Sequence, residues 1–316
     1  MKTGGGQVME SEASTTSVER DPTTSAPAPE LPANVRAVEI VSDGTRMAGN
    51  FWRPADAAQG EARPCVLMIH GWGGLKSHLN STYAPRFCAE GWNVLTFDFR
   101  GWGESEGRLL PAGRVNPPLG HGETRAVEVT ETREVVDPVA QSVDVEAAIA
   151  WLEGEPGVDR GRMALWGSSL GGGLALRAAI DHPEFSSLIS QIANSNPRSN
   201  WLAFGGEMGP LGDANIRKWQ IGIARGLMPS VPDPSAALGE LVGAPHYPEF
   251  VPFDPMKRID ELQAHVLVID AADEELFDAD RNGGLLHQIL EPRGQSERRV
   301  FPGQHYDLYS GDSYDR

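Results

Sequence analysis

The sequence has only two cysteines, Cys65 and Cys88, among 316 residues. One stands beside an apolar strand-like run and the other in a helix-like run, so we expect two buried structural thiols. This scarcity argues against a disulfide framework, and a zinc site would need more soft ligands at closer spacing. We therefore predict no metal site and take the cytoplasm as the compartment.

Long apolar segments and an excess of basic residues are also missing. No run of about 18 apolar residues occurs, so we predict no membrane-spanning helix. The N-terminal segment lacks the apolar stretch of a secretory signal. Lys and Arg number 27 against 44 Asp and Glu, which gives a formal net charge of −17. This charge repels phosphate backbones and anionic lipid surfaces, so we predict neither a nucleic-acid nor a membrane partner.

The composition changes near residue 35. Residues 1–34 are rich in Ser, Thr, Pro, Ala and Glu and predict a disordered tail, because they cannot bury enough apolar area to offset the entropy of ordering. Residues 35–316 predict an α/β domain that opens with an antiparallel pair, VRAVEIV and MAGNFW around Ser-Asp-Gly. Continuous apolar runs then alternate with helical stretches, which is typical of a mostly parallel sheet with helices on both faces.

The alternation can be followed along most of the domain. Strands are predicted at CVLMIH, NVLTFDF, RMALW, SLISQIA, HVLVID and RRVF, with helices near 78–90, 138–153, 170–181 and 285–290. It stops for roughly 65 residues after Ala193, and a structureless loop of that length is improbable in a compact domain. We therefore predict an inserted, partly helical cap over residues 196–262.

Two segments match the pattern Gly-x-Ser-x-Gly. Around Ser169 the apolar run MALW precedes the match and the helical run LGGGLALRAAI follows it, which predicts the strand-to-helix turn that exposes a nucleophilic serine. Around Ser105 the match follows the loop FRGWG and no helix-like run follows directly. We predict Ser169 as the nucleophile and regard the Ser105 match as a decoy.

A serine hydroxyl needs a base within hydrogen-bond reach and donors aimed at the oxyanion. His305 lies in the loop PGQHYDLY after the last predicted strand, whereas His287 falls inside a helical run. The oxyanion donors predicted are the backbone amides of Leu170 and of Trp72, the latter in the glycine-rich loop HGWGG. His70 in this loop precedes the nucleophile and more plausibly ties loops together.

The segments HGWGG, FDFRGWGESEG, WGSSLGGG and PGQHYDLY together resemble the α/β-hydrolase superfamily. The likeness is to its dienelactone-hydrolase-like and X-Pro-peptidase-like (S15-type) serine esterase branch, and it extends from Val35 to the C-terminus. It implies an acyl-enzyme mechanism without a cofactor, and it leaves a homo-oligomer possible. Relatives usually add a helix after the histidine, whereas this chain ends 11 residues after His305, which is consistent with a shortened C-terminus.

The acid of the predicted triad should follow the strand HVLVID. The resemblance places a Gly-x-x-Asp turn there, and aligning Ala271 with that glycine makes Glu274 the acid. Asp273 is the alternative and needs a shift of one residue, while Asp270 and Asp278 are further candidates.

We therefore expect a carboxylic-ester hydrolase acting on a small or medium apolar ester. An apolar pocket is predicted from Trp201, Phe204, Met208 and Trp219 in the cap, together with Trp72, although these side chains could equally pack the cap itself. Peptidase, amidase or thioesterase activity would use the same triad. A catalytically dead homologue that serves as a binding protein is the alternative outside enzymes.

Overall fold

The computed structural model describes residues 31–203, 212–233, 241–311 and 314. Contacts within the chain divide it into Met1–Pro32 and Ala33–Arg316, and the second unit contains every helix and strand described below. The predicted tail lies outside the described residues except for residues 31–34, so its disorder stays a prediction.

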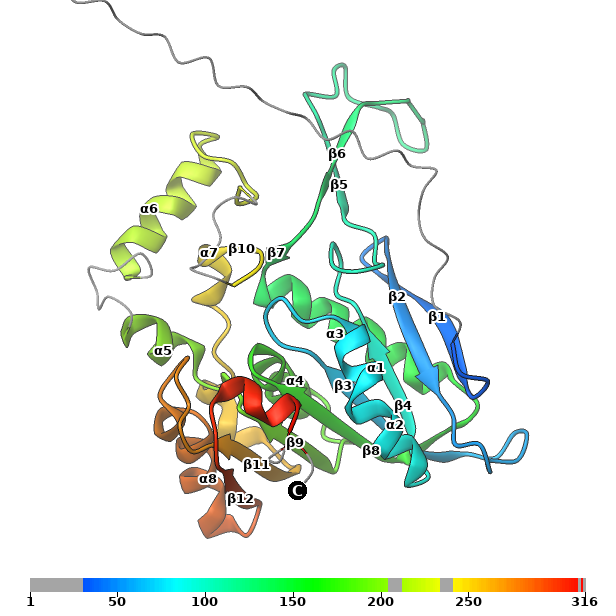
Figure 1. Cartoon of the computed structure of the whole chain (residues 1–316). Helices are drawn as coiled ribbons and strands as arrows, with labels where there is room; N and C mark the ends of the chain where they lie inside the picture. Colours follow the sequence, from blue (N-terminus) through cyan, green and yellow to red (C-terminus); the bar gives the residue numbers. More distant parts are fainter. Residues whose placement is uncertain (1–30, 204–211, 234–240, 312–313, 315–316) are drawn as a thin grey trace, which may run out of the picture. The chain divides into compact units, whose positions relative to one another are not determined.

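Eight strands form one sheet in the order β1-β2-β4-β3-β8-β9-β11-β12 (Figure 1). The pairs β1 with β2 and β2 with β4 are antiparallel, and all the following neighbours are parallel. The strands are Val35–Ser42 (β1), Thr45–Trp52 (β2), Arg63–Ile69 (β3), Asn93–Phe97 (β4), Val158–Ser168 (β8), Ser187–Gln191 (β9), His265–Ala271 (β11) and Ser296–Phe301 (β12). The predicted α/β class, with an antiparallel pair leading into a mostly parallel sheet, is confirmed.

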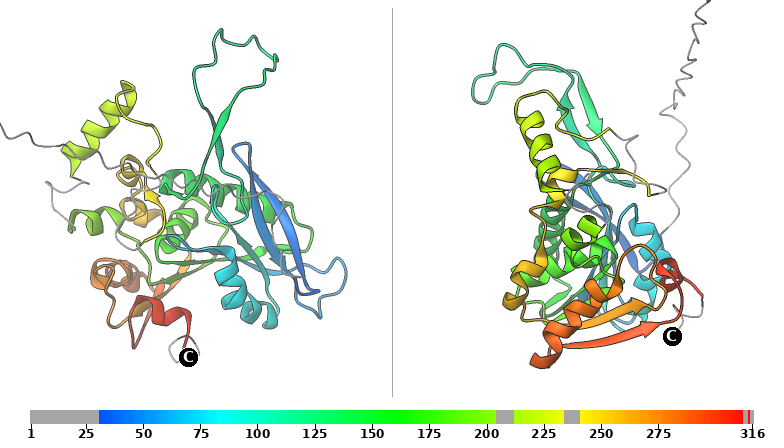
Figure 2. Two further views of the ribbon diagram at one scale, coloured as in Figure 1. Left: turned by 45° about the horizontal axis from the view of Figure 1, so that its top comes forward. Right: turned by 90° about the vertical axis from the view of Figure 1, so that its left-hand side faces the viewer.

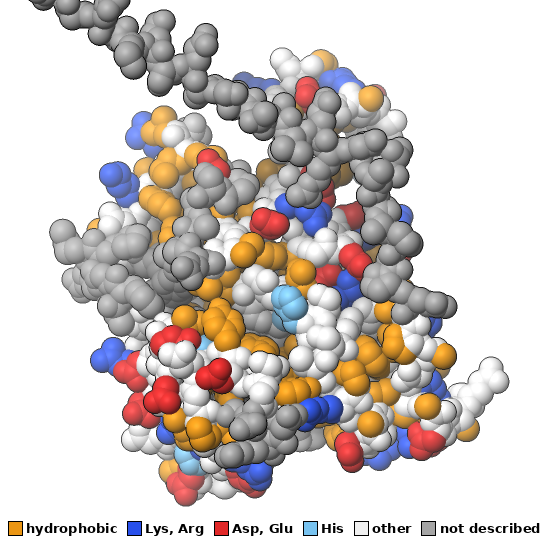
Figure 3. Space-filling model, in the orientation of Figure 1, with side chains coloured by type: hydrophobic (Ala, Val, Ile, Leu, Met, Phe, Trp, Pro, Cys, Tyr) orange, Lys and Arg blue, Asp and Glu red, His pale blue; other side chains and the backbone are white. Residues whose placement is uncertain are grey.

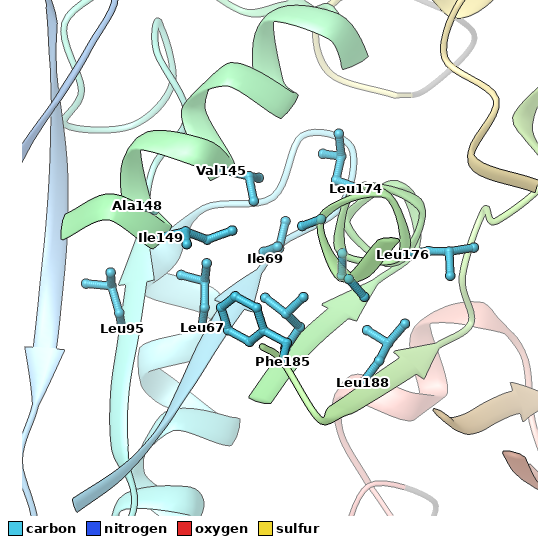
Figure 4. Packing of buried hydrophobic residues seen from close by; sticks show 14 of the residues in the cluster. Leu67, Ile69, Leu95, Val145, Ala148, Ile149, Leu174, Leu176, Phe185 and Leu188 are labelled. Atoms are coloured by element: carbon cyan, nitrogen blue, oxygen red, sulfur yellow. The ribbon is translucent and has the colours of Figure 1, made fainter. Parts of the chain in front are cut away.

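Helices cover both faces of this sheet. Leu67 and Ile69 of β3 pack against one pair of helices, α3 and α4, as Figure 4 shows, whereas Val66 and Met68 belong to a second cluster with α1 and α2. A strand covered on both faces gives a continuous apolar run in the sequence, which explains CVLMI. The helices around the sheet are Lys76–Ser81 (α1), Tyr83–Ala89 (α2), Pro138–Gly154 (α3), Leu170–Asp181 (α4) and Gly283–Leu290 (α8).

The chain leaves the sheet after β9 and returns to it at the neighbouring strand β11. The elements between these strands are Pro197–Ala203 (α5), Asp213–Ala224 (α6), Ala244–Pro245 (β10), Tyr247–Phe250 (α7) and the 3-10 helix Pro255–Glu261 (η2). They lie within the predicted cap. Several contacts join this segment to the rest of the domain. Among them, β10 pairs with Val135–Val136 (β7), and His246 Nδ1 lies 2.8 Å from Asp137 Oδ2 at the start of α3.

A two-stranded antiparallel arm, Arg108–Pro111 (β5) with Val129–Thr132 (β6), projects away from the sheet in both views of Figure 2. These two strands are not among those predicted from the sequence. Most of their residues are exposed, so the arm lacks the buried face whose alternating polarity would reveal a strand in the sequence.

Two features are absent from the part of the chain that the structure describes. No helix there is both long and apolar enough to cross a membrane. No group of three or more His, Cys, Asp or Glu side chains there could hold a metal ion. Cys65 and Cys88 are buried and unbridged.

Candidate active site

Ser169 occupies the tight turn between β8 and α4. Its φ of 55° and ψ of −127° are costly for a residue that carries a side chain, and such strain persists only where neighbouring structure enforces it. The Ser169 amide donates to the carbonyl of Gln191 (3.0 Å), and its own carbonyl accepts from the amides of Gly172 and Asn194 (2.9 Å each). The ends of β8, β9 and α4 thus fix this serine, and it lines a cavity.

The glycines around this turn permit close contact between backbones. A Cβ atom on Gly171 would lie 2.2 Å from the carbonyl oxygen of Ile69, and one on Gly71 would lie 2.8 Å from the Cβ of Ser169. Neither distance is tolerable without a backbone shift. The loop after β3 and the start of α4 therefore approach the serine closely because both carry glycine.

His305 and Glu274 form a buried pair. The Nδ1 atom of His305 lies 2.9 Å and 2.8 Å from the two carboxylate oxygens of Glu274, and the two side chains are only 1% and 3% exposed. The amide of Leu276 donates to Glu274 (3.0 Å), and the amide of His305 donates to Glu275 (2.9 Å). An ionised carboxylate only accepts, so a hydrogen bond here requires the tautomer that carries its proton on Nδ1 and leaves the Nε2 lone pair free.

The other candidate acids have different partners. Asp273 is exposed, and its amide donates to the carbonyl of Gly303 (3.0 Å). Asp270 is buried but pairs with Arg298 (2.7 Å), and Asp278 caps the 3-10 turn that follows it. The structure therefore brings Glu274, the favoured acid, to His305.

The segment that carries His305 is tied to the serine strand through tyrosines. It forms the 3-10 helix His305–Tyr309 (η5), and the Tyr309 hydroxyl lies 2.5 Å from the hydroxyl of Ser168. The Tyr83 hydroxyl donates to the carbonyl of Leu308. Burial raises the pKa of Tyr309 and raises the pKa of Tyr83 to about 12, so both remain neutral hydroxyls at physiological pH. The histidine loop is thereby anchored beside the residue that precedes Ser169.

A cavity of about 980 Å³ opens at Ser169 and His305. Hydrophobic side chains gather around a histidine on the face shown in Figure 3. The volume is suited to a small or medium organic ligand. The cavity is lined by His70, Gly71, Trp72, Gly73, Gly74, His78, Leu79, Ser81, Thr82, Ser169, Leu170, Asn194, Asn200, Leu241, Val242, Leu276, Phe277, His305, Tyr306 and Tyr309.

Trp72 and Leu170, the two predicted oxyanion donors, both line this cavity. Leu170 is the first residue of α4, where an amide has no partner within the helix. The indole of Trp72 stacks on Phe250 with ring centroids 5.8 Å apart, and its Nε1 donates to the carbonyl of Val242 (3.0 Å). Trp72 thus also holds residues of the inserted segment over the cavity.

A buried ion pair connects the start of α1 to the loop after β4. The Lys76 ammonium lies 2.7 Å from Asp98 and 2.6 Å from Glu104, and the side chains of Lys76 and Asp98 are almost fully buried. The amides of Lys76 and Glu104 also donate to Asp98. The segment FDFRGWGESEG therefore supports the cavity wall and makes no contact with the Glu274–His305 pair in the hydrogen bonds described.

The cap residues that were predicted to line the pocket are not found among the described residues of the cavity wall. Trp219 packs against Tyr247, with ring centroids 5.1 Å apart, and does not line the described cavity, as expected if this aromatic packs the cap. The side chain of Trp201, and Phe204 and Met208, lie outside the described residues.

Sequence reasoning missed several cavity residues. Phe277 and Tyr306 line the cavity beside the catalytic candidates, and Asn194 and Asn200 line its wall after β9. Phe277 and Tyr306 immediately neighbour the predicted acid and base segments in the sequence, and that adjacency was the available signal. Nothing local distinguishes the two asparagines.

His70 is a buried wall residue. Its Nδ1 lies 3.1 Å from the carbonyl of Gly71, its ring meets Phe99 edge-on at 4.7 Å, and its buried Nε2 has no hydrogen-bond partner in the described structure. Burial lowers the pKa of His70, which favours the neutral ring. His287 lies on α8 and bonds to the hydroxyl of Ser296 (2.8 Å).

The sequence profile of the X-Pro dipeptidyl-peptidase (S15) family matches residues 43–212 of this chain, more than half of its length. The chain belongs to the S15 family. It is therefore a hydrolase with the α/β-hydrolase fold, and the resemblance inferred from its motifs is confirmed.

Relatives in sequence cover most of this S15-family chain. The quorum-quenching protein AidA of Acinetobacter baumannii is 25% identical over 308 residues, covering 88% of this chain and 90% of its own. An uncharacterized 31.7 kDa protein of Escherichia coli, from the traX-finO intergenic region, is 24% identical and covers 80% of this chain and 87% of its own.

Solved structures similar to this S15-family chain have the same fold. A hypothetical protein of Pseudomonas aeruginosa gives a TM-score of 0.66 at 20% identity, with 91% of both chains covered. Est1E of Butyrivibrio proteoclasticus, solved with ferulic acid bound, gives 0.60 at 16% identity, with 85% of this chain and 91% of its own covered. At these identities the likeness concerns the fold alone.

Proposed function

We propose that this S15-family hydrolase is a serine carboxylic-ester hydrolase with Ser169 as nucleophile, His305 as base and Glu274 as acid. The observation that carries the proposal is the buried Glu274–His305 pair, which opens on the same cavity as Ser169. A histidine paired with a buried carboxylate, within reach of a serine, is the arrangement that activates a serine hydroxyl at neutral pH, and the shared cavity supports such a role for these three residues.

In the acylation step, Ser169 Oγ attacks the ester carbonyl while its proton passes to His305 Nε2. Glu274 accepts the Nδ1 proton in a hydrogen bond and stabilises the resulting imidazolium. The carbon–oxygen bond of the leaving group then breaks, and His305 returns the proton to the departing alkoxide. An alcohol leaves, and the acyl group remains on Ser169.

In the deacylation step, His305 removes a proton from a water molecule that attacks the acyl carbonyl. The tetrahedral intermediate collapses, the bond to Ser169 Oγ breaks, and His305 returns its proton to the serine. The amides of Trp72 and Leu170 would stabilise the oxyanion in both steps, and removing such a donor costs about 3 kcal/mol in comparable sites.

The cavity favours an apolar ester. Leu241, Val242, Leu276 and Phe277 supply aliphatic and aromatic surface around the proposed nucleophile. Thioester hydrolysis is the second candidate, because Thiohydrolase aneE of Aspergillus aculeatus is 32% identical over 152 residues, although these cover only 48% of this chain. Because the S15 family is described as X-Pro dipeptidyl-peptidases, an amide substrate is included in the test of leaving groups.

The test is a rapid-mixing assay with butyryl compounds that differ only in the leaving group: the p-nitrophenyl ester, a thiophenyl ester and the p-nitroanilide. We expect a burst of p-nitrophenol equal to the enzyme concentration and a kcat/KM for the ester well above that for the anilide. Ser169→Ala should lower kcat/KM by at least about 10³-fold, as loss of a triad nucleophile does.

Labelling by a fluorophosphonate, followed by peptide mass spectrometry, locates the nucleophile independently of substrate choice. An adduct on Ser169 is expected. An adduct elsewhere, or full activity in Ser169→Ala, would refute the assignment, and a folded protein that neither labels nor turns over would support the non-enzymatic alternative. Preference for the thioester would retain the triad but change the reaction.

A further inference from the structure

Three asparagine side chains form a hydrogen-bonded chain that begins at the cavity wall. Asn194 follows β9, Asn200 lies in α5, and Asn282 precedes α8. Asn200 Nδ2 donates to Asn194 Oδ1 (2.6 Å) and to Asn282 Oδ1 (2.9 Å), and Asn282 Nδ2 donates to Asn200 Oδ1 (2.8 Å). Asn200 is 5% exposed and Asn282 is 0% exposed, so both amides depend on these bonds.

Backbone groups fix the direction of this chain. The amide of Asn196 donates to Asn282 Oδ1 (3.0 Å), and Asn282 Nδ2 donates to the carbonyl of Asp278 (2.8 Å). A backbone N–H can only donate and a carbonyl can only accept, so the Asn282 side chain cannot be turned over. Asn282 and Asn200 each donate to the other, so the direction of the Asn282 side chain also fixes that of Asn200. The second hydrogen of Asn200 Nδ2 then requires an acceptor on Asn194, which must be Oδ1.

The consequence is that Asn194 keeps its NH₂ group for the cavity. Within the described structure, Nδ2 of Asn194 has no hydrogen bond. It is also not one of the fully buried polar atoms that lack a partner, so Nδ2 is accessible from outside the protein. Asn194 is half-buried and lines the cavity, and its own amide donates to the carbonyl of Ser169 (2.9 Å). Asn194 therefore offers a pure hydrogen-bond donor among the residues that line the same, mostly apolar cavity as the proposed nucleophile.

We infer that Asn194 is a specificity-determining residue, and that the preferred substrate is an apolar ester with a second acceptor oxygen near the scissile carbonyl. This inference rests on the proposed function. An ether, oxo or acylamino oxygen of the acyl group would accept from Asn194 Nδ2. A plain alkyl chain would leave this donor desolvated and unpaired, and a site built to bond a polar group discriminates against an analogue that lacks it.

The test compares acyl groups of equal length with and without an ether oxygen. The pairs are p-nitrophenyl methoxyacetate with butyrate, and p-nitrophenyl 4-methoxybutyrate with hexanoate, so that the oxygen occupies two positions. The measured quantity is the kcat/KM of the oxygen-containing ester divided by that of the alkyl ester. Dividing the wild-type ratio by the variant ratio cancels the intrinsic reactivity of the esters.

Asn194→Asp keeps an acceptor for Asn200 but replaces the NH₂ group with an acceptor oxygen. We expect it to lower the ratio by about tenfold or more for at least one pair, as loss of one substrate hydrogen bond predicts. Asn194→Leu, which removes the donor without adding charge, should lower the ratio in the same direction. Asn196→Ala is the matched control, because the side chain of Asn196 bonds to Arg281 rather than lining the cavity, and it should leave the ratio within about twofold.

The outcomes separate this inference from the proposed function. Suppose that Asn194→Asp has the melting temperature of the wild type and lowers kcat/KM equally for both esters of each pair. The specificity role is then wrong, and the esterase function stands. If Asn194→Asp fails to fold, an unchanged ratio in Asn194→Leu overturns the inference. If the wild type hydrolyses none of the four esters and Ser169 does not label, the proposed function fails and the inference falls with it.

Discussion

The segments around Ser105 and Ser169 share the pattern Gly-x-Ser-x-Gly, and their serines have opposite surroundings. Ser105 is 1% exposed, and its hydroxyl is fully used: it donates to the carbonyl of Asp98 (2.7 Å) and accepts from the amide of Ala48 (2.9 Å). Ser169 lies in a strand-to-helix turn and lines the cavity. The first serine joins the middle of β2 to the residue that follows β4, and the second is available to a ligand.

The last position of each segment nevertheless requires glycine for the same physical reason, which is the lack of space for a Cβ atom. A Cβ on Gly107 would lie 2.1 Å from the carbonyl oxygen of Thr132, and one on Gly171 would lie 2.2 Å from that of Ile69. In both places glycine permits two backbones to touch. The pattern thus reports close backbone approach, and only the surrounding strand, helix and histidine loop make one of the two serines a candidate nucleophile.

The largest expected effect concerns the partners that only the Ser169 segment has. Glu274→Gln should lower kcat/KM for p-nitrophenyl butyrate by about 10³- to 10⁴-fold, because the amide would favour the wrong tautomer of His305. Asp273→Asn, on the exposed neighbouring side chain, should change it by less than about threefold. Steady-state kinetics on both variants decide the point, and the reverse order of effects would make Asp273 the acid.

Substituting the last glycine of either segment should lower stability to a similar extent, but only the substitution in the Ser169 segment should lower activity. Gly107→Ala and Gly171→Ala should each lower the free energy of unfolding by about 1–3 kcal/mol or more, because each added methyl meets a backbone carbonyl. Denaturant unfolding gives these values. Per folded molecule, only Gly171→Ala should also lower kcat. Equal kcat in the two variants would mean that the serine turn tolerates displacement.

Ser105→Ala should be the converse of Ser169→Ala. It leaves the buried amide of Ala48 and the carbonyl of Asp98 without their partner, and we expect a loss of about 1–3 kcal/mol in the free energy of unfolding. Its kcat/KM should stay within about twofold of the wild type. Thermal melting and ester hydrolysis on the same preparations make the comparison, and a large activity loss in folded Ser105→Ala would remove the distinction between the two segments.

The smallest effect lies at the far end of the helix that Ser169 begins. His182 caps α4, and although burial alone would lower its pKa, hydrogen bonds to Glu146 and Glu184 outweigh burial and raise it. A raised pKa in the folded state means that this stabilisation is complete below the unfolded pKa of about 6.5 and is lost as pH rises through the folded value. His182→Gln should therefore lower the free energy of unfolding by about 0.5 kcal/mol at pH 6 and by less at pH 9, and it should leave kcat unchanged. Urea unfolding at the two pH values tests this, and an equal loss at both would exclude the charge as its cause.

The fold was largely predictable because its signals are local. Strands covered on both faces appear as continuous apolar runs, and the helix predicted at 170–181 matches α4 because its boundaries are set by the serine turn and the cap at His182. The arm of β5 and β6 was missed because a ribbon with no buried face has no polarity pattern. The sequence also predicted Ser169, His305 and a short choice of acids, since their positions follow from motif order.

What the sequence alone determined is the order of elements and the residues that compete for each role, because both depend on neighbours along the chain. Only the tertiary structure decided that Glu274 rather than Asp273 meets His305, because the turn after β11 is oriented by a bond from the Asp273 amide to Gly303, far away in the sequence. The direction of the Asn194 amide was likewise decided by two backbone groups far apart in the sequence, the amide of Asn196 before α5 and the carbonyl of Asp278 before η3, the 3-10 helix Ala279–Arg281. Long-range hydrogen bonds choose among chemically similar side chains, and no local pattern encodes them.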